Sequence, residues 1–147
     1  MKTEHCAGGI ILRKSRNCWQ LLLIKDMSGK WTFPKGKIEK GLPAQAGESS
    51  LEAAVREIKE EVGLFDLSMV ERLSSISYTY KRNGIVKKTV DYFLFISTIG
   101  QSITLQKEEG IQDAKWVTVS DALKAVGYPQ TYIPLVQKVQ ALVSKFS

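Results

Sequence analysis

The sequence predicts a single α/β domain over residues 1–147. The chain has 147 residues, of which 44% are hydrophobic, and this size and composition suit one domain with a core of its own. Short β-rich runs alternate with segments of helical periodicity, and no repeat or low-complexity tract interrupts them. Together these observations indicate one sheet packed with helices.

Apolar runs bounded by turn residues predict the first and last strands. Residues 6–14 and 18–26 form two such runs, separated by a polar Ser-Arg-Asn segment. Residues 31–34 form a third, which Pro34 ends because proline lacks the N–H that a sheet requires. A last strand is expected over residues 116–119.

A hairpin is expected within residues 74–97. Asn83 and Gly84 lie between two β-rich runs and form a dipeptide typical of a type I′ turn. Because strand side chains alternate between faces, Tyr78 and Tyr80 are expected on one face of their strand.

The central helix has clear limits at residues 50–62. Ser49 is expected to cap its start and Glu52 to complete a capping box, while Gly63 supplies the left-handed residue that commonly ends a helix. At helical spacing, one apolar stripe is expected to pack on the core; it consists of Leu51, Val55, Ile58 and Val62.

Two further helices are expected near the end of the chain. Ser120 is the predicted cap of a short helix over residues 121–126. A final helix is expected over residues 132–146, where the apolar residues at helical spacing are Tyr132, Val136, Val139, Val143 and Phe146.

Three carboxylates crowd the C-terminal end of the central helix. Glu57, Glu60 and Glu61 are expected to converge opposite the apolar stripe, flanked by the small Ala53 and Ala54, which leave open space. Like charges at this spacing repel one another, and carboxylates near a helix C-terminus oppose its macrodipole. An ordinary solvated face of a surface helix is one explanation. The other is a site for a hard divalent cation such as Mg²⁺ or Mn²⁺.

The cation site gains weight because Arg56 and Lys59 are not spaced to neutralise all three acids. Conflict with local rules is typical of functional sites. The net charge of +6 favours an anionic partner. The single histidine, His5, is expected in a solvated terminal tail, which argues against zinc sites and a Ser-His-Asp triad.

The cysteines and the apolar runs of the chain indicate its expected location and whether a membrane partner is expected. Cys6 and Cys18 allow at most one bridge, and the N-terminus lacks the apolar stretch of a secretory signal, so a reducing cytoplasm is expected. No apolar run approaches the roughly 20 residues that span a bilayer, so no membrane partner is expected.

Residues 48–64 resemble the C-terminal part of the Nudix box, the signature of the Nudix hydrolase family, with the pattern G-x5-E-x7-R-E-U-x-E-E-x-G-U. The matching positions are Glu48, Arg56, Glu57, Ile58, Glu60, Glu61, Gly63 and Leu64. The preceding FPKGKIEKG and the later AKWVTVSDAL also look like family segments.

One position departs from the Nudix pattern. Leu42 stands where the box has a glycine. If Gly36 is the family glycine, about six residues within 41–47 are an insertion, which is inexpensive in a loop. The departure affects the expected position of Glu48 and the pocket rim, not the three acids.

The resemblance implies the Nudix α/β/α sandwich, with a mixed sheet between helices, and a Mg²⁺-dependent pyrophosphohydrolase. By similarity, Glu57, Glu60 and Glu61 hold the metal, with the backbone carbonyl of Lys35 or Gly36 completing the shell. One of these glutamates is also a candidate base.

Two residues beside the box acids also receive expected roles from the resemblance. Arg56 resembles the family arginine that orients a box glutamate. Outside the box, Glu109 is preferred over Glu108 as a further acid, against the alternative of a solvated loop charge.

The expected partner is a small phosphoanhydride. Phosphate-binding candidates are Lys35, Lys37, Lys81, Arg82, Lys87 and Lys88, and base-stacking candidates are Tyr78 and Tyr80; surface lysines and packing tyrosines are the plainer alternatives. Overall the sequence looks most like the branch with diadenosine polyphosphate and diphosphoinositol polyphosphate hydrolases.

Several other functions remain open. Oxidised nucleoside triphosphates are the second substrate choice, followed by ADP-ribose and capped RNA. A non-catalytic Nudix-fold binding module is a further alternative, and the sequence shows no signature of a nucleic-acid-binding domain.

Overall fold

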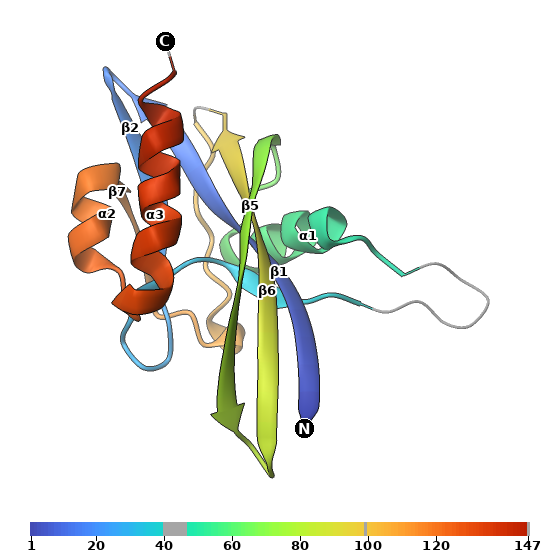
Figure 1. Ribbon diagram of the computed structural model, residues 1–147. Coiled ribbons are helices and arrows are strands. Elements are labelled where there is room, and N and C mark those ends of the chain that lie inside the picture. Colours follow the sequence, from blue (N-terminus) through green and yellow to red (C-terminus); the bar gives the residue numbers. More distant parts are fainter. Residues whose placement is uncertain (40–46, 99, 147) are drawn as a thin grey trace.

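One mixed seven-stranded sheet organises the computed structural model, which describes residues 1–39, 47–98 and 100–146, apart from the side chain of Glu109. The strand order is β3-β2-β1-β6-β5, with β4 also paired to β1 and β7 to β2. Helix α1 covers one face, and α2 and α3 cover the other (Figure 1). The predicted α/β/α sandwich is confirmed. The strands are β1 (Lys2–Ser15), β2 (Cys18–Lys25), β3 (Trp31–Thr32), β4 (Lys35–Lys37), β5 (Leu67–Lys81), β6 (Ile85–Ser97) and β7 (Asp113–Thr118). The helices are α1 (Ser50–Val62), the 3-10 turn η1 (Lys107–Glu109), α2 (Val119–Ala125) and α3 (Pro129–Val143).

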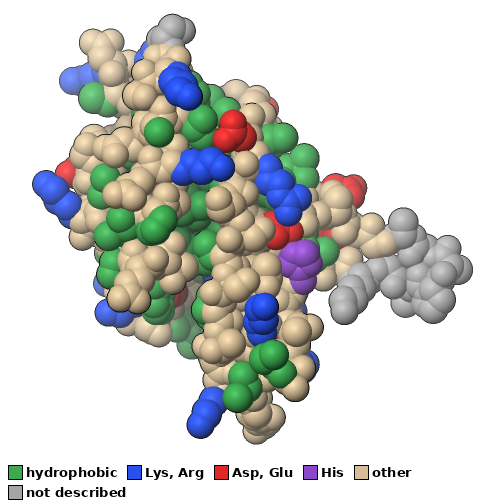
Figure 2. All heavy atoms as spheres, in the orientation of Figure 1, with side chains coloured by type: hydrophobic (Ala, Val, Ile, Leu, Met, Phe, Trp, Pro, Cys, Tyr) green, Lys and Arg blue, Asp and Glu red, His purple; other side chains and the backbone are tan. Residues whose placement is uncertain are grey.

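Strand β1 lies at the centre of the sheet and is longer than expected. It begins at Lys2 rather than at residue 6 because its first residues pair in parallel with β6, from Lys2 opposite Val86 onward. His5 is therefore part of a strand and not of a solvated tail. Its Nε2 lies 2.7 Å from Oδ2 of Asp91, although the side chain remains 54% exposed. It is the purple side chain visible on the surface in Figure 2.

The β5–β6 hairpin forms as expected, with positive φ at Asn83 (52°) and Gly84 (116°). Its first strand starts at Leu67, seven residues before the expected position. Of the residues from Leu67 to Leu73, only Leu73 is fully buried, so the apolar alternation that reveals a strand is weak there.

Helix α1 has the predicted limits, but a different face packs on the sheet. The capping box is present, since the Ser49 hydroxyl accepts from the Glu52 N–H at 3.1 Å and the Glu52 carboxylate accepts from the Ser49 N–H at 2.9 Å. Gly63 adopts the left-handed conformation (φ 78°).

The buried face of α1 contains two of the acids. Ala53 and Ala54 are fully buried rather than beside open space, and Glu57 and Glu61 are only 8% and 6% exposed. Of the predicted apolar stripe, Ile58 and Val62 are buried, whereas Leu51 and Val55 are only half-buried. The small alanines allow this close approach. On β1, a Cβ added to Gly9 would lie 2.7 Å from Cδ1 of Ile58.

The C-terminal elements also shift by a few residues. Strand β7 spans Asp113–Thr118, and Thr118, not Ser120, caps α2, accepting from the Asp121 N–H at 3.1 Å. Helix α3 begins at Pro129, three residues early, since proline is favoured in a first helical turn. Among the described residues, no helix has the length and apolarity to cross a bilayer.

Candidate active site

Arg56 joins the acidic end of α1 to the neighbouring loop and to β4. Its Nη2 donates to Oε1 of Glu48 at 2.6 Å and to the backbone carbonyl of Lys37 at 2.9 Å. Its Nη1 donates to Glu57 at 2.9 Å and to Glu60 at 3.1 Å. One guanidinium therefore contacts three carboxylates. Those of Glu48 and Glu57 are mostly buried, whereas that of Glu60 is half-exposed.

This network agrees with the expectation that the basic residues of α1 do not neutralise all three acids, because the hydrogen bonds of Arg56 reach two of the three, Glu57 and Glu60. Hydrogen bonds with Glu48, followed by those with Glu57, raise the pKa of Arg56 above its ordinary value. Reciprocally, the hydrogen bonds from Arg56 lower the pKa of Glu48. Both groups therefore remain charged at neutral pH.

The loop before α1 is tied at its two described ends. Oε1 of Glu48 also accepts from the backbone N–H of Glu39 at 2.8 Å, and the Glu48 N–H donates to the Glu39 carbonyl at 3.2 Å. The insertion expected within residues 41–47 lies, except for Gly47, outside the described residues. Glu48 thus contacts both Arg56 and the described end of the preceding segment.

Gly36 lies directly against the carboxylate of Glu57. A Cβ added at Gly36 would overlap all three atoms of that carboxylate, so only glycine fits there with the present side-chain position. The backbone of β4, including the predicted Gly36, is therefore brought to the acidic face of α1.

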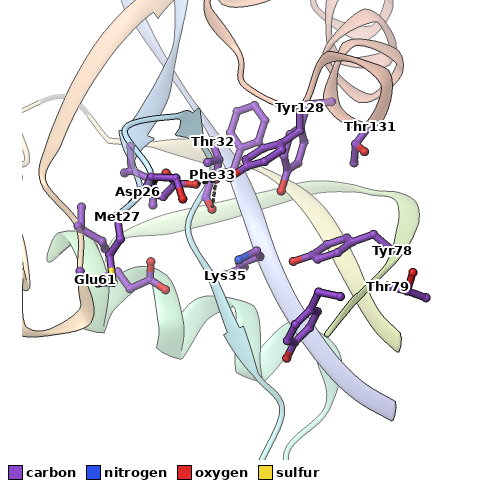
Figure 3. Close-up of a pocket in the computed structure, with 16 residues that line it drawn as sticks. Asp26, Met27, Thr32, Phe33, Lys35, Glu61, Tyr78, Thr79, Tyr128 and Thr131 are labelled. Carbon is purple, nitrogen blue, oxygen red and sulfur yellow. Dashed lines mark hydrogen bonds between the residues drawn. The ribbon is translucent and has the colours of Figure 1, made fainter. Parts of the chain in front are cut away.

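A cavity of about 600 Å³ opens beside this acidic end, and five aromatic side chains contribute to its wall. We refer to it as the aromatic cavity; its lining residues are Ile24, Asp26, Met27, Ser28, Thr32, Phe33, Lys35, Glu61, Tyr78, Thr79, Tyr80, Gly110, Ile111, Tyr128, Thr131 and Tyr132. In Figure 3, Glu61 projects from α1 into one side, Tyr78 and Tyr128 lie on the other, and Lys35 lies between them. Of the three acids, Glu61 is the one that lines the cavity.

Two lining residues, Tyr128 and Asp26, were not singled out from the sequence. The Tyr128 hydroxyl donates to Oδ2 of Asp26 at 3.0 Å, and Oδ1 of Asp26 accepts the Ser28 and Lys30 N–H groups, both at 2.9 Å. Tyr132 was predicted as core and is indeed buried, with its hydroxyl 2.9 Å from that of Tyr92. No sequence signal marks Tyr128, because its hydrogen-bond partner Asp26 follows β2 and is brought beside it only in the folded chain.

Lys35 brings a partly buried ammonium to the aromatic cavity. Burial, followed by repulsion from Lys88, lowers the pKa of Lys35, while the negative charge of Glu61 acts in the opposite direction. A cation thus lies near the acid that faces the cavity, as binding of a phosphate requires.

A second, smaller cavity of about 290 Å³ holds three of the six predicted phosphate-binding residues. We refer to it as the basic cavity; its lining residues are Glu4, Lys37, Tyr78, Tyr80, Arg82 and Lys88. Tyr78 and Tyr80 line both cavities, which confirms that they share one face of β5. Burial raises the pKa of Tyr78, and its hydrogen bond to Glu4 raises that of Tyr80.

Three other predicted residues are not assembled with the rest. Lys87 and Lys81 line neither of these two cavities. Because strand side chains alternate, Lys87 faces away from its neighbour Lys88, so the structure brings only Lys88 to the basic cavity. Glu109 belongs to η1, but its side chain lies outside what the structure describes, and its predicted role stays a prediction.

The carboxylates of Glu57, Glu60 and Glu61 are suitable ligands for a hard cation, but their side chains do not converge on one point. Within residues 1–39, 47–98 and 100–146, no three His, Cys, Asp or Glu side chains converge as a ligand group. Arg56 holds Glu57 and Glu60 instead. Carboxylate oxygens remain the donors that Mg²⁺ prefers.

Comparison with known proteins agrees with this architecture. The family model of the NUDIX domain matches residues 3–138. The chain belongs to the Nudix family. The predicted membership is thereby confirmed, and with it the class of hydrolase.

Individual Nudix proteins resemble the chain to different extents. Solved structures with a similar fold include an Ap4A hydrolase of Caenorhabditis elegans in a binary complex, with a TM-score of 0.78, 27% identity and coverage of 97% of this chain and 99% of that one. An RNA pyrophosphohydrolase of Nitratiruptor is 32% identical over 112 residues, or 70% of this chain and 68% of that protein. A nudix protein of C. elegans is 32% identical over 126 residues, which are 83% of this chain but only 30% of that longer protein.

Proposed function

We propose that this protein is a Mg²⁺-dependent pyrophosphohydrolase acting on a nucleoside diphosphate linked to a further group. The observation that carries the proposal is the position of Glu61. It belongs to the Nudix box on α1 and lines a cavity of about 600 Å³ to which Phe33 and four tyrosines also contribute. A cavity of this size and lining suits a nucleotide.

Glu57, Glu60 and Glu61 would hold the metal, together with the backbone carbonyl of Lys35 or Gly36. Three features of the chain support this fit: the donors are oxygens, Glu57 and Glu61 are almost fully buried, and the β4 backbone approaches Glu57 as closely as a glycine allows. When bound, Mg²⁺ neutralises phosphate charge and activates water. Mn²⁺ has the same ligand preference.

The chain itself supplies binding and orientation. Lys35 would contact a phosphate between the acids and the aromatic wall, and Tyr78 and Tyr128 would stack on a base. Arg56 would orient Glu57, since the two are hydrogen-bonded at 2.9 Å. Glu109 remains our candidate for an additional acid from outside the box.

Within this class we favour a dinucleoside polyphosphate, with an inositol pyrophosphate as the related choice. Two features support the preference. The basic cavity shares Tyr78 and Tyr80 with the aromatic cavity and is also lined by Lys37, Arg82 and Lys88. The similar solved structure described above is named as an Ap4A hydrolase, and Ap4A is such a compound.

Removal of pyrophosphate from a triphosphate RNA end is the second candidate, because a relative at 32% identity is named RNA pyrophosphohydrolase. A long RNA strand would favour a continuous basic strip. The basic side chains on the face drawn in Figure 2 are instead dispersed over several elements. Both cysteines are free thiols, in keeping with the cytoplasm as our proposed location.

A substrate panel with Mg²⁺ tests the proposal. Diadenosine tetraphosphate, an inositol pyrophosphate, ADP-ribose, an oxidised nucleoside triphosphate and a 5′-triphosphate RNA would be compared by kcat/KM, with products identified by chromatography. We expect the highest value for diadenosine tetraphosphate. A higher value for the RNA or the oxidised nucleotide would change the substrate, and no turnover of any member would favour the non-catalytic binding module.

A further inference from the structure

The basic cavity contains an anion that the proposed reaction does not use. Oε2 of Glu4, on β1, lies 2.7 Å from Nζ of Lys37, and Oε1 accepts from the Tyr80 hydroxyl and lies 3.9 Å from Nζ of Lys88. The Glu4 side chain is 8% exposed, whereas that of Lys37 is 66% exposed. The carboxylate therefore lies beneath its cations, with Lys37 on the solvent side.

This carboxylate is charged at any physiological pH. The hydrogen bonds from Lys37 and then Tyr80 lower the pKa of Glu4 to about 2. Its two oxygens accept from an ammonium and a hydroxyl, the groups that commonly bind phosphate oxygens. Glu4 thus accepts hydrogen bonds from Lys37 and Tyr80, the same donors that a phosphate in this cavity would need.

The position of Glu4 is expected to affect the binding of long and short polyphosphates differently. Tyr78 and Tyr80 form the wall shared by the two cavities. In the proposed binding mode, with the base in the aromatic cavity and the first phosphates near Lys35, further phosphates would extend toward Lys37 and Lys88. A long polyphosphate would therefore contact the basic cavity more than a short substrate does.

We propose that Glu4 is a specificity-determining residue, an internal counter-anion that competes with the distal phosphates of a long polyphosphate for Lys37, Lys88 and Tyr80. It lowers the affinity for long polyphosphates and leaves short substrates unaffected. This inference rests on the proposed function, which places the reacting phosphates beside α1.

The contacts of Glu4 favour competition over a supporting role. The ion pair with Lys37 involves an ammonium that is mostly in water, and such pairs contribute little to stability. A multiply charged phosphate chain can therefore take over Lys37 at small cost. If Glu4 instead held the lysines in a binding arrangement, loss of its charge would weaken phosphate binding, so the two roles predict opposite signs.

The test is the affinity of inorganic tripolyphosphate for the wild type and for Glu4→Gln, measured by titration calorimetry in metal-free buffer at low salt. Glutamine keeps the shape and can still accept from Tyr80. Removing one negative charge about 4 Å from a bound anion should tighten binding about fivefold or more. Asp121→Asn is the control, because it makes the same charge change at an exposed residue of α2 that lines neither cavity; its affinity should change less than about twofold. Unchanged or weaker binding by Glu4→Gln would overturn the inference.

Kinetics add a readout that depends on substrate length. In Glu4→Gln, KM for diadenosine tetraphosphate should fall while KM for ADP-ribose and both kcat values stay constant. An equal fall for both substrates would overturn the inference. The two proposals fail separately: absence of turnover by the wild type contradicts the proposed function, whereas the tripolyphosphate comparison needs no hydrolysis and tests Glu4 alone.

Discussion

The acidic end of α1 and the aromatic cavity beside it are assembled in opposite ways. The three acids and Arg56 lie within six consecutive residues of one helix, so their spacing follows from the helical repeat. The cavity wall draws on β2, β3, β4, β5, α3 and the segment before β7. The comparison teaches that the proposed chemistry depends on a local pattern, whereas substrate choice depends on the assembled fold.

The largest effect on activity is expected for the acids of α1, of which Glu61 also lines the aromatic cavity. Replacing Glu61 or Glu60 by Gln should lower kcat/KM by at least ~100-fold, the order expected when a metal ligand or its support is removed. The melting temperature should hold, because glutamine keeps the shape of the side chain and the half-exposed ion pair of Glu60 with Arg56 contributes little to stability. Steady-state assays and thermal melts of each variant check this, with Asp121→Asn as control. Full activity of both glutamine variants would refute the site assignment.

Arg56→Ala should break the acidic region without touching the cavity wall. Glu48 and Glu57 lose their main hydrogen-bond donor, so we expect about 2 kcal/mol of destabilisation, measured by urea unfolding in metal-free buffer. Added Mg²⁺ should restore part of this, because it binds the native state only. A variant with unchanged stability and rate would show that Arg56 is an ordinary surface charge.

The stability difference between the wild type and Arg56→Ala should depend on pH in a defined direction. Arg56 lowers the pKa of Glu48 from its ordinary 4.5. The stabilisation by this pair is therefore complete above about pH 5.5 and is lost as the pH falls through and below 4.5. Urea unfolding of both proteins between pH 7 and pH 3 checks this; a difference that grows toward acid would contradict it.

The cavity wall is expected to act on binding and not on the chemical step. Tyr128→Ala should raise KM for diadenosine tetraphosphate about tenfold and leave kcat nearly unchanged, since stacking contributes about 1–3 kcal/mol per base. Tyr128→Phe is the matched control: it keeps the ring and loses only the hydrogen bond to Asp26. If Phe and Ala raise KM equally, the ring does not stack on the base.

The smallest expected effect distinguishes two neighbouring lysines. Lys88→Ala should lower kcat/KM for diadenosine tetraphosphate about fivefold at low salt and less at physiological salt, because Lys88 lines the basic cavity. Lys87→Ala, with the same charge change on the opposite face of β6, should change it less than about twofold. Equal effects would mean that net charge, and not the basic cavity, attracts the substrate.

The sequence predicted what local chemistry determines. The limits of α1 follow from Ser49, Glu52 and Gly63, and these contacts form within the helix itself. The Asn83-Gly84 turn has the same local origin. The family and the α/β/α sandwich followed from the box and its flanking segments.

The sequence could not predict which side of α1 meets the sheet. Hydrophobicity favoured Leu51 and Val55, but the small Ala53 and Ala54 allow closer packing on β1 and carry Glu57 and Glu61 inward with them. Tyr128, Asp26 and Glu4 were missed for a related reason. The contacts that bring them to the cavities, Glu4 with Tyr80 and Asp26 with Tyr128, join residues 76 and 102 positions apart in the chain, so no short window of sequence contains both partners.

Hydrolysis of diadenosine tetraphosphate as a function of Mg²⁺ concentration tests the central claim most directly. If the box acids on α1 and the aromatic cavity form one hydrolytic site, turnover should be negligible in chelator and rise to saturation with Mg²⁺. The products should be two mononucleotides with no free orthophosphate, because an internal phosphoanhydride is cleaved. Turnover that persists in chelator, or none at saturating Mg²⁺ for any member of the substrate panel, would contradict the account.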